Sequence, residues 1–434
     1  MEMDTMAITK KRRGERRVAY SVLCRIILTI VSLSVAAAFI RPALSDYYSQ
    51  RISESDRKKL LLASLITTEN ARYQYFLGLL DHAALDRPGT EKAIGHYLLS
   101  LKSNPTDSQS WIAIAKAYRD TGRSKEAEYA MRKALYLDKN IPEVIWESGL
   151  FFLLESKQTD ALHLFRRYID MVPDEQANVY SLCYMMRVEP MSILNNLIPP
   201  KYPYYKSYLD FLIAKKLLNE SIETWKKIKT FNPERSEYLR YADFLIESGE
   251  TREASAVWDD FTKNFNIMEK RPSGGMLWNG DFELPIENGG FDWRIGAAEG
   301  VRVFRDRDIK WTGFASLSVN FDGRSNPGIS LAYQIVPVTP GQKYKLTGYI
   351  RTEKITTENG ILFQASGHLC SPFVKTTESV TGTTLWKKID LDFTVPKECK
   401  TVAVSVKREQ SYKFDSKISG DAWIDSLSMT QKNN

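Results

Sequence analysis

Residues 110–138 read SWIAIAKAYRDTGRSKEAEYAMRKALYLD, and this segment is the best guide to how the middle of the chain folds. Its apolar and small residues recur at helical spacing on both sides of Gly122, which predicts two helices joined by a tight turn. The small residues Ala115 and Ala127 allow the two helices to approach closely. The same pattern returns at intervals of 34 residues. The residues that share this period are Ala93, Ala127 and Ala161 and, four positions later, Tyr97, Met131 and Phe165.

The 34-residue period resembles that of tetratricopeptide repeats, in which each unit is a pair of antiparallel helices. The resemblance is strongest over 107–173 and predicts a helical array over 70–270. Four prolines interrupt the period in 174–204, where we expect an irregular helical pair. Helical arrays of this kind present a concave surface to partner proteins. The resemblance therefore implies a protein-binding role for this part of the chain.

Charged residues in the best-defined unit are the candidates for contact with a partner. Lys116, Arg119 and Asp120 lie beside the predicted core residue Tyr118. We expect at least one of the three to face a partner protein rather than the core.

The beginning of the chain has the pattern of a membrane anchor. Six cations in 10–17 precede a mostly apolar segment, 18–40, whose only charge is Arg25. At a rise of 1.5 Å per residue, 23 helical residues cross a hydrocarbon core of roughly 30 Å. The preceding cations favour a cytoplasmic N-terminus. The pattern predicts a cytoplasmic tail over 1–17, a transmembrane helix over 18–40 and a linker or helix over 41–69.

This topology places the bulk of the protein on the periplasmic side of a bacterial inner membrane. An alternative keeps the export but not the anchor. The most apolar part, 26–40, is short, and the small residues in 43–45 could form a signal-peptidase site. The chain would then be a soluble exported protein.

The formal net charge of +7 is unevenly distributed along the 434 residues. Residues 1–41 hold eight Lys and Arg against three Asp and Glu, which leaves little surplus for the rest. A nucleic-acid-binding protein needs clustered cations on its folded surface. The distribution therefore excludes nucleic acid as a partner.

The sequence changes in character after 272–275, where helical periodicity gives way to short alternating runs between Gly, Pro and Asn turns. This spacing predicts a two-sheet β-sandwich over 276–431. Within 342–351 the alternation places Tyr344, Leu346, Gly348 and Ile350 on one face of a strand. The predicted fold class is therefore multidomain α plus β: an N-terminal transmembrane helix, a helical solenoid and a C-terminal jelly roll.

Particular residues sharpen the prediction for this domain. Asn279-Gly280-Asp281-Phe282-Glu283, followed by Trp293, resembles the first strand of galactose-binding-like jelly rolls, which include many carbohydrate-binding modules. The later segments 340–346 and 422–427 appear in the same order as in that family. The resemblance implies a possible structural calcium ion at Glu283 and Asp425. The alternative is that Glu283 binds backbone amides and Asp425 caps a turn.

Sugar binding by such a module requires exposed aromatic rings beside polar side chains. The candidates are Trp311, in a loop-like segment, and Trp293 with Arg294, for which the core and the ligand face are equally good alternatives. Strand alternation instead predicts that Trp386 and Trp423 belong to the core.

The cysteines allow one disulfide within a single domain. Of the four cysteines, only Cys370 and Cys399 share the predicted sandwich. Their pairing requires an oxidising compartment, which the predicted export supplies. We expect a disulfide between them.

The sequence has no signature of a catalytic site. The four histidines lack metal-binding spacing, and the chain has no P-loop, dinucleotide motif or nucleophile elbow. Asp390 and Asp392 alternate on a predicted strand, a pattern typical of a solvated face. The protein is predicted not to be an enzyme.

Residues 277–283 together with 289–295 resemble a group of bacterial repeat proteins associated with extracellular polysaccharide production. This resemblance implies a non-catalytic scaffold that supports assembly or export of a polysaccharide. Its partners would be membrane-embedded or periplasmic proteins of that assembly. Glycan would be a further partner. Two alternatives remain: a lectin-like glycan-binding protein without an assembly role, and an accessory to a glycoside hydrolase.

Overall fold

The computed structural model describes residues 27–30, 32, 70–267, 275–414 and 416–432. The chain divides into two compact units, 1–208 and 209–434. Of the predicted membrane segment 18–40, only 27–30 and 32 are described, and these residues are helical. The predicted tail 1–17 and linker 41–69 lie outside the described residues. Within the described part of the chain, no helix is both long and apolar enough to cross a membrane.

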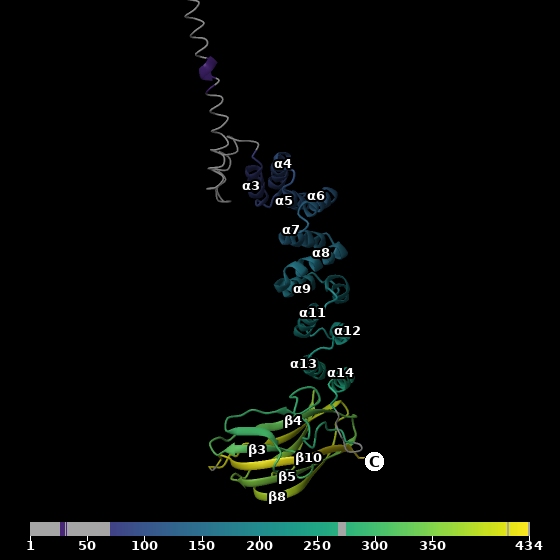
Figure 1. Cartoon of the computed structure of the whole chain (residues 1–434), viewed down its shortest axis with the longest axis vertical. Coiled ribbons are helices and arrows are strands. Elements are labelled where there is room, and N and C mark those ends of the chain that lie inside the picture. Colours follow the sequence, from purple (N-terminus) through teal and green to yellow (C-terminus); the bar gives the residue numbers. More distant parts are fainter. Residues whose placement is uncertain (1–26, 31, 33–69, 268–274, 415, 433–434) are drawn as a thin grey trace, which may run out of the picture. The chain divides into compact units, whose positions relative to one another are not determined.

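The first unit consists of helical pairs (Figure 1). The pairs are α3 (Ala71–His82) with α4 (Arg87–Ser103), α5 (Ser108–Asp120) with α6 (Ser124–Leu137), and α7 (Pro142–Leu154) with α8 (Gln158–Met171). An irregular segment follows, as the prolines predict. It comprises the 3-10 turn η1 (Pro173–Glu175), α9 (Gln176–Met185), the short α10 (Pro190–Ser192) and the π-helical turn η2 (Ile193–Leu197). The next helix, α11 (Tyr202–Ala214), begins in this unit.

The residues that share the 34-residue period form the contact between the two helices of a pair. Phe165 is fully buried against Gly149, where an added Cβ would lie 2.7 Å from the ring. Tyr97 packs in the same way on Gly78, at 2.4 Å. The ring of the second helix therefore needs a position without a side chain on the first helix. This packing explains the large–small pattern seen in the sequence.

The turns inside the α5–α6 and α7–α8 pairs have the same structure. Gly122 and Ser156 adopt left-handed conformations, with φ of 80° and 60°. The next amide donates back across the helix end, from Arg123 N to Tyr118 O and from Lys157 N to Phe152 O, both at 2.8 Å. These bonds satisfy carbonyl groups that the helix end leaves unpaired. The repeated turn sets the antiparallel direction of every second helix.

The second unit begins within α11 and continues with α12 (Leu218–Ile228), the 3-10 turn η3 (Lys229–Phe231), α13 (Arg235–Glu247) and α14 (Thr251–Asn264). A β-sandwich follows. Its strands are β1 (Arg294–Ile295), β2 (Val301–Asp306), β3 (Ser316–Asp322), β4 (Ile329–Pro337), β5 (Lys343–Ile355), β6 (Leu362–His368), β7 (Val374–Thr376), β8 (Gly382–Thr394), β9 (Thr401–Arg408) and β10 (Ser419–Gln431).

The strands form two antiparallel five-stranded sheets. We call the sheet with the order β1-β4-β9-β6-β7 the inner-helix sheet, since α13 and α14 contact it. The sheet with the order β2-β3-β10-β5-β8 is called the open sheet (Figure 1). The predicted alternation in 342–351 is confirmed, because Tyr344, Leu346 and Ile350 are fully buried in the core between the sheets.

The disulfide between Cys370 and Cys399 is present, with the two Cα atoms 5.2 Å apart. It joins the segment after β6 to the segment before β9, so it holds together the ends of two neighbouring strands. Cys183 is a free buried thiol, and burial raises its pKa to about 12. A thiol with such a pKa is inert near neutral pH.

Candidate functional site

The loop between β2 and β3 carries Trp311 and is held by two carboxylates. Asp425 Oδ2 accepts hydrogen bonds from Trp311 N and Thr312 N at 2.7 and 3.0 Å. Glu283 Oε1 accepts from Phe314 N and Ala315 N at 2.7 and 3.2 Å. Carboxylates that accept backbone N–H bonds make strong, charge-assisted contacts. The loop therefore has a defined conformation, and its tryptophan has a defined place.

These contacts involve Glu283 and Asp425, the two residues predicted to hold calcium. Glu283 and Asp425 are indeed brought together, and both bind the segment 311–315, as in the alternative to a metal site. In the part of the chain described, no group of three or more His, Cys, Asp and Glu is placed to hold a metal. A calcium ion at Glu283 and Asp425 stays a prediction.

Trp311 is the centre of an aromatic surface on the open sheet. Its indole is 44% exposed and stacks on Tyr349 of β5, with 4.5 Å between ring centroids and 17° between ring planes. Trp386 of β8 lies 6.3 Å away at an angle of 56°. One face of Trp311 is covered by Tyr349, so the other face is available to solvent. We call Trp311, Tyr349 and Trp386 the aromatic surface.

The register of the open sheet explains why these rings face outward. Tyr349 lies beside core residue Ile350, and successive side chains of a strand point to opposite faces. A β-bulge interrupts the pairing of β5 with β8 after Ile350, so that Leu385 and Trp386 together oppose Arg351. The pairing is regular up to Lys387, so the alternation from the core-facing Leu391 and Ile389 places Trp386 on the outer face, with Lys388 and Asp390. Trp386 is therefore a half-buried surface residue, and the expectation that it belongs to the core is wrong.

Trp423 extends this surface in a more protected position. Its neighbours Ala422 and Ile424 point into the core, so Trp423 points outward, although it is only 6% exposed. Its Nε1 donates to Asp306 Oδ2 at 2.8 Å, and the guanidinium of Arg351 lies 5.4 Å from the ring centroid. These contacts cover Trp423 and leave the aromatic surface as the exposed part.

The other two sugar-binding candidates have structural roles. Trp293 is fully buried against Phe282 and donates its Nε1 to Asn279 O, which corrects the expectation that it faces a ligand. Arg294 is also engaged, because its Nη2 bonds Asp243 Oδ1 of α13 at 2.5 Å and Gly290 O at 2.8 Å. Neither residue is available for a sugar. Trp311 is the candidate that the structure places on the surface.

Helices α13 and α14 contact the inner-helix sheet, within residues 209–434. Trp258 of α14 meets Trp278 and Phe291 with centroid distances of 5.2 and 6.2 Å. Gly290 N donates to Asp243 Oδ1 at 2.8 Å, and an added Cβ on Gly290 would come within 2.3 Å of Trp258. The contact is therefore close enough to require glycine. It places helices over part of the sheet face opposite the aromatic surface.

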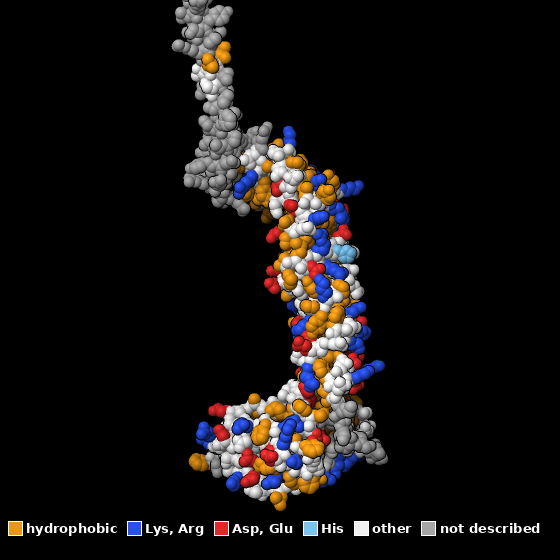
Figure 2. Space-filling view, viewed as in Figure 1, with side chains coloured by type: hydrophobic (Ala, Val, Ile, Leu, Met, Phe, Trp, Pro, Cys, Tyr) orange, Lys and Arg blue, Asp and Glu red, His pale blue; other side chains and the backbone are white. Residues whose placement is uncertain are grey.

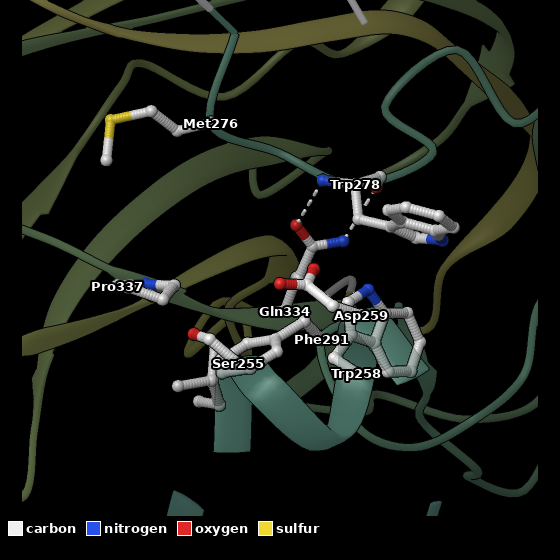
Figure 3. Close-up of a pocket in the computed structure, with 9 residues that line it drawn as sticks. Ser255, Trp258, Asp259, Met276, Trp278, Phe291, Gln334 and Pro337 are labelled. Atoms are coloured by element: carbon white, nitrogen blue, oxygen red, sulfur yellow. Dashed lines mark hydrogen bonds between the residues drawn. The ribbon is translucent and has the colours of Figure 1, made fainter. Parts of the chain in front are cut away.

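Figure 3 shows a small cavity at this contact, with Trp258 and Phe291 on one side and Gln334 of β4 on another. The amide of Gln334 bonds both backbone groups of Trp278, accepting from N and donating to O, each at 2.8 Å. The cavity volume is about 120 Å³. Small-molecule sites typically measure about 300–1,000 Å³. We assign the cavity to packing between helix and sheet.

The three partner-binding candidates of α5 are paired with neighbouring helices. Lys116 Nζ lies 2.7 Å from Glu147 Oε2 of α7, and Asp120 Oδ2 lies 2.9 Å from His82 Nε2 of α3. Arg119 pairs with Asp120 at 3.1 Å. Figure 2 shows charges of both signs interspersed along these helices on the visible face. The side chains link successive pairs, and contact with a partner stays a prediction.

Searches with this chain found no matching family model and no matching curated protein. Solved structures similar to its C-terminal domain include a module described as CBM4, at 16% identity over 36% of this chain and 99% of that one, with a TM-score of 0.28. TmCBM61 in complex with beta-1,4-galactotriose matches at 16% identity over 36% and 99% of the two chains, with a TM-score of 0.26. The CBM22-1 xylan-binding domain of Paenibacillus barcinonensis Xyn10C matches at 14% identity over 38% and 99%, with a TM-score of 0.26. The C-terminal domain thus resembles carbohydrate-binding modules.

Proposed function

We propose that this protein is a non-catalytic glycan-binding protein that uses the aromatic surface of the open sheet. The observation that carries the proposal is the exposed face of Trp311, fixed by Tyr349 beneath it and by Asp425 behind its loop. The C–H bonds of a pyranose ring carry partial positive charge, which suits the negative face of an aromatic ring. Because the loop is already ordered, binding loses little conformational entropy.

Two carboxylates of β8, Asp390 and Asp392, support a non-catalytic role. Asp390 is paired with Lys345 at 2.8 Å, and Asp392 with Lys432 at 2.7 Å. The Lys345 partner holds the pKa of Asp390 below its usual range. A glycosidase needs one carboxyl group with a raised pKa to act as a general acid. These two aspartates are poorly suited to that task.

Within this proposal, the helical pairs bind partner proteins, and the protein supports assembly or export of an extracellular polysaccharide. The resemblance of 277–283 and 289–295 motivates this finer role. Export across the inner membrane is supported by the disulfide Cys370–Cys399, since disulfides persist in oxidising compartments. We place the anchor in 18–40, and a reporter fused after Asn434 that works only outside the cytoplasm tests this topology.

The test of glycan binding is retention on immobilised polysaccharides, with full-length protein and two variants. Trp311→Ala removes the stacking face and should weaken binding at least about tenfold, the effect of losing roughly 1.4 kcal/mol. The matched control is Tyr412→Ala, since Tyr412 is 94% exposed on the same domain and has no aromatic neighbour within the described residues. Equal binding by both variants would assign glycan recognition to another surface. Failure of the unmodified protein to bind any glycan would contradict the proposal itself.

A further inference from the structure

The carboxylates nearest to the aromatic surface are already satisfied by the protein. On the outer face of the open sheet, Tyr349 has Lys388 of β8 and Asp425 of β10 as its register partners. Asp425 is occupied by the loop amides. Asp390, one step further along β8, bonds Lys345 and Thr347 Oγ1, each at 2.8 Å. Both carboxylates therefore already have hydrogen-bond or ion-pair partners within the protein.

The cations at the same place lack such partners. Lys388 is exposed, and Arg351 is half-buried with its guanidinium over the Trp423 ring. Neither forms an ion pair with an acidic side chain in the described segments. The loop of Trp311 adds Arg307 and Lys310, both exposed, against the single exposed acid Asp308. The surroundings of the aromatic surface therefore include cations without a direct ion pair, although Lys388 also lowers the pKa of Asp390 and Glu353 lies two positions from Arg351 on β5.

We infer that the aromatic surface selects acidic glycans, in which sugar rings carry carboxylate groups. This inference rests on the proposed glycan-binding function and specifies the class of ligand. A pyranose would stack on the free face of Trp311, while its carboxylate pairs with Lys388 or Arg351. Both cations flank Tyr349 on the strands that carry the rings, so stacking and charge pairing act on the same or adjacent sugars. Guanidinium groups bind carboxylates through paired hydrogen bonds, which adds geometric selectivity.

The experiment compares acidic with neutral polysaccharides. Full-length protein is titrated with polygalacturonate and with its methyl ester, which has the same sugar backbone without the negative charges. Alginate and dextran provide a second acidic and neutral pair. We expect the acidic member to bind at least about tenfold more tightly at low salt, with the difference shrinking as salt screens the exposed charges.

Two charge reversals locate the effect. Lys388→Glu should weaken binding of polygalacturonate about three- to tenfold and leave its methyl ester unaffected. Lys375→Glu on β7, an exposed lysine of the inner-helix sheet, is the matched control and should behave like the unmodified protein. Thermal melting of both variants checks that they fold.

The outcomes separate this inference from the proposed function. Equal binding of the acidic and neutral ligands, with Lys388→Glu and Lys375→Glu indistinguishable, would overturn the selectivity and leave glycan binding in place. Preference for the neutral ligands would overturn it as well. Absence of binding to all four polysaccharides would overturn the proposed function together with the inference.

Discussion

The buried carboxyl group of Asp292, beside the first strand, contributes to the pH dependence of the sandwich. Asp292 is fully buried, and its Oδ2 accepts a hydrogen bond from Glu287 N at 2.6 Å. Burial raises the pKa of Asp292 to about 7. The unfolded group has a pKa of about 3.9, so between the two values the folded protein binds a proton that the unfolded chain releases. Stability from this group is therefore present at low pH and is lost as the pH rises from about 4 to 7.

Asp292→Asn should remove this part of the pH dependence, because the amide is neutral at every pH and keeps an oxygen for Glu287 N. The full effect of the titration is on the order of 4 kcal/mol. Urea unfolding of the variant between pH 4 and 8 should show a flatter profile than the unmodified protein. Asp308→Asn, at an exposed acid, should keep the original slope. Identical profiles for all three proteins would contradict the assignment to Asp292.

For single residues, the sequence predicts which side chains come together more reliably than it predicts which side chains are exposed. Glu283 and Asp425 are predicted to lie near each other, and both accept hydrogen bonds from the loop 311–315, because the sandwich brings the start and the end of the domain to this loop. Trp293 and Trp311 look alike in the sequence, yet one is core and the other surface. Tyr349 could be found from the alternation in 342–351. Trp386 could also be found, because it alternates in step with Asp390 and Asp392, which are predicted to face solvent.

At the scale of elements, the contact of α13 and α14 with the inner-helix sheet depends on one carboxylate. Asp243 Oδ1 accepts from both Gly290 N and Arg294 Nη2, and the Arg294 side chain is only 16% exposed. Loss of Asp243 leaves a mostly buried guanidinium without its acid. Hydrogen bonds to charged groups contribute about 1.5–3 kcal/mol. The helical pair is therefore held to the sheet by a polar contact beside the aromatic one.

Asp243→Ala should lower the stability of this contact by about 1.5–3 kcal/mol, so that α13 and α14 unfold before the sandwich. Differential scanning calorimetry should then show a separate transition at lower temperature. Asp259→Ala changes an exposed acid that lines the cavity in Figure 3 and should melt like the unmodified protein. If the two variants melt alike, the polar contact does not hold the helices.

The elements themselves are well predicted from the sequence, since periods of 3.6 and 2 residues are local properties. The predicted irregular helical segment in 174–204 and the predicted change from helices to strands after 275 are both present in the structure. The contact of α13 with 289–294 is not predictable in this way, because it joins two elements that are each complete by local pattern. Its one sequence signal is the pair Gly289-Gly290: Gly290 lies against Trp258, and Gly289 lies against Asp243 and Leu239 of α13.

For the whole molecule, the two sheets of the sandwich differ in what covers them. The inner-helix sheet has helices against it, whereas the open sheet presents Trp311, Tyr349 and Trp386. The disulfide stabilises the domain independently of this difference, by about 3 kcal/mol for a loop of this length in the chain-entropy model. In the proposed function the two sheets therefore have different roles: one sheet binds the chain's own helices, and the other binds glycan.

Hydrogen–deuterium exchange of the full-length protein, with and without its tightest-binding polysaccharide, tests this division most directly. The account predicts slower exchange in peptides covering 307–315 and 384–390 when the glycan is bound. Peptides from β4 and β6 should be unchanged, because α13 and α14 already contact that sheet. Protection of β4 and β6 without protection of 307–315 would show that the glycan occupies the opposite sheet and would contradict the account.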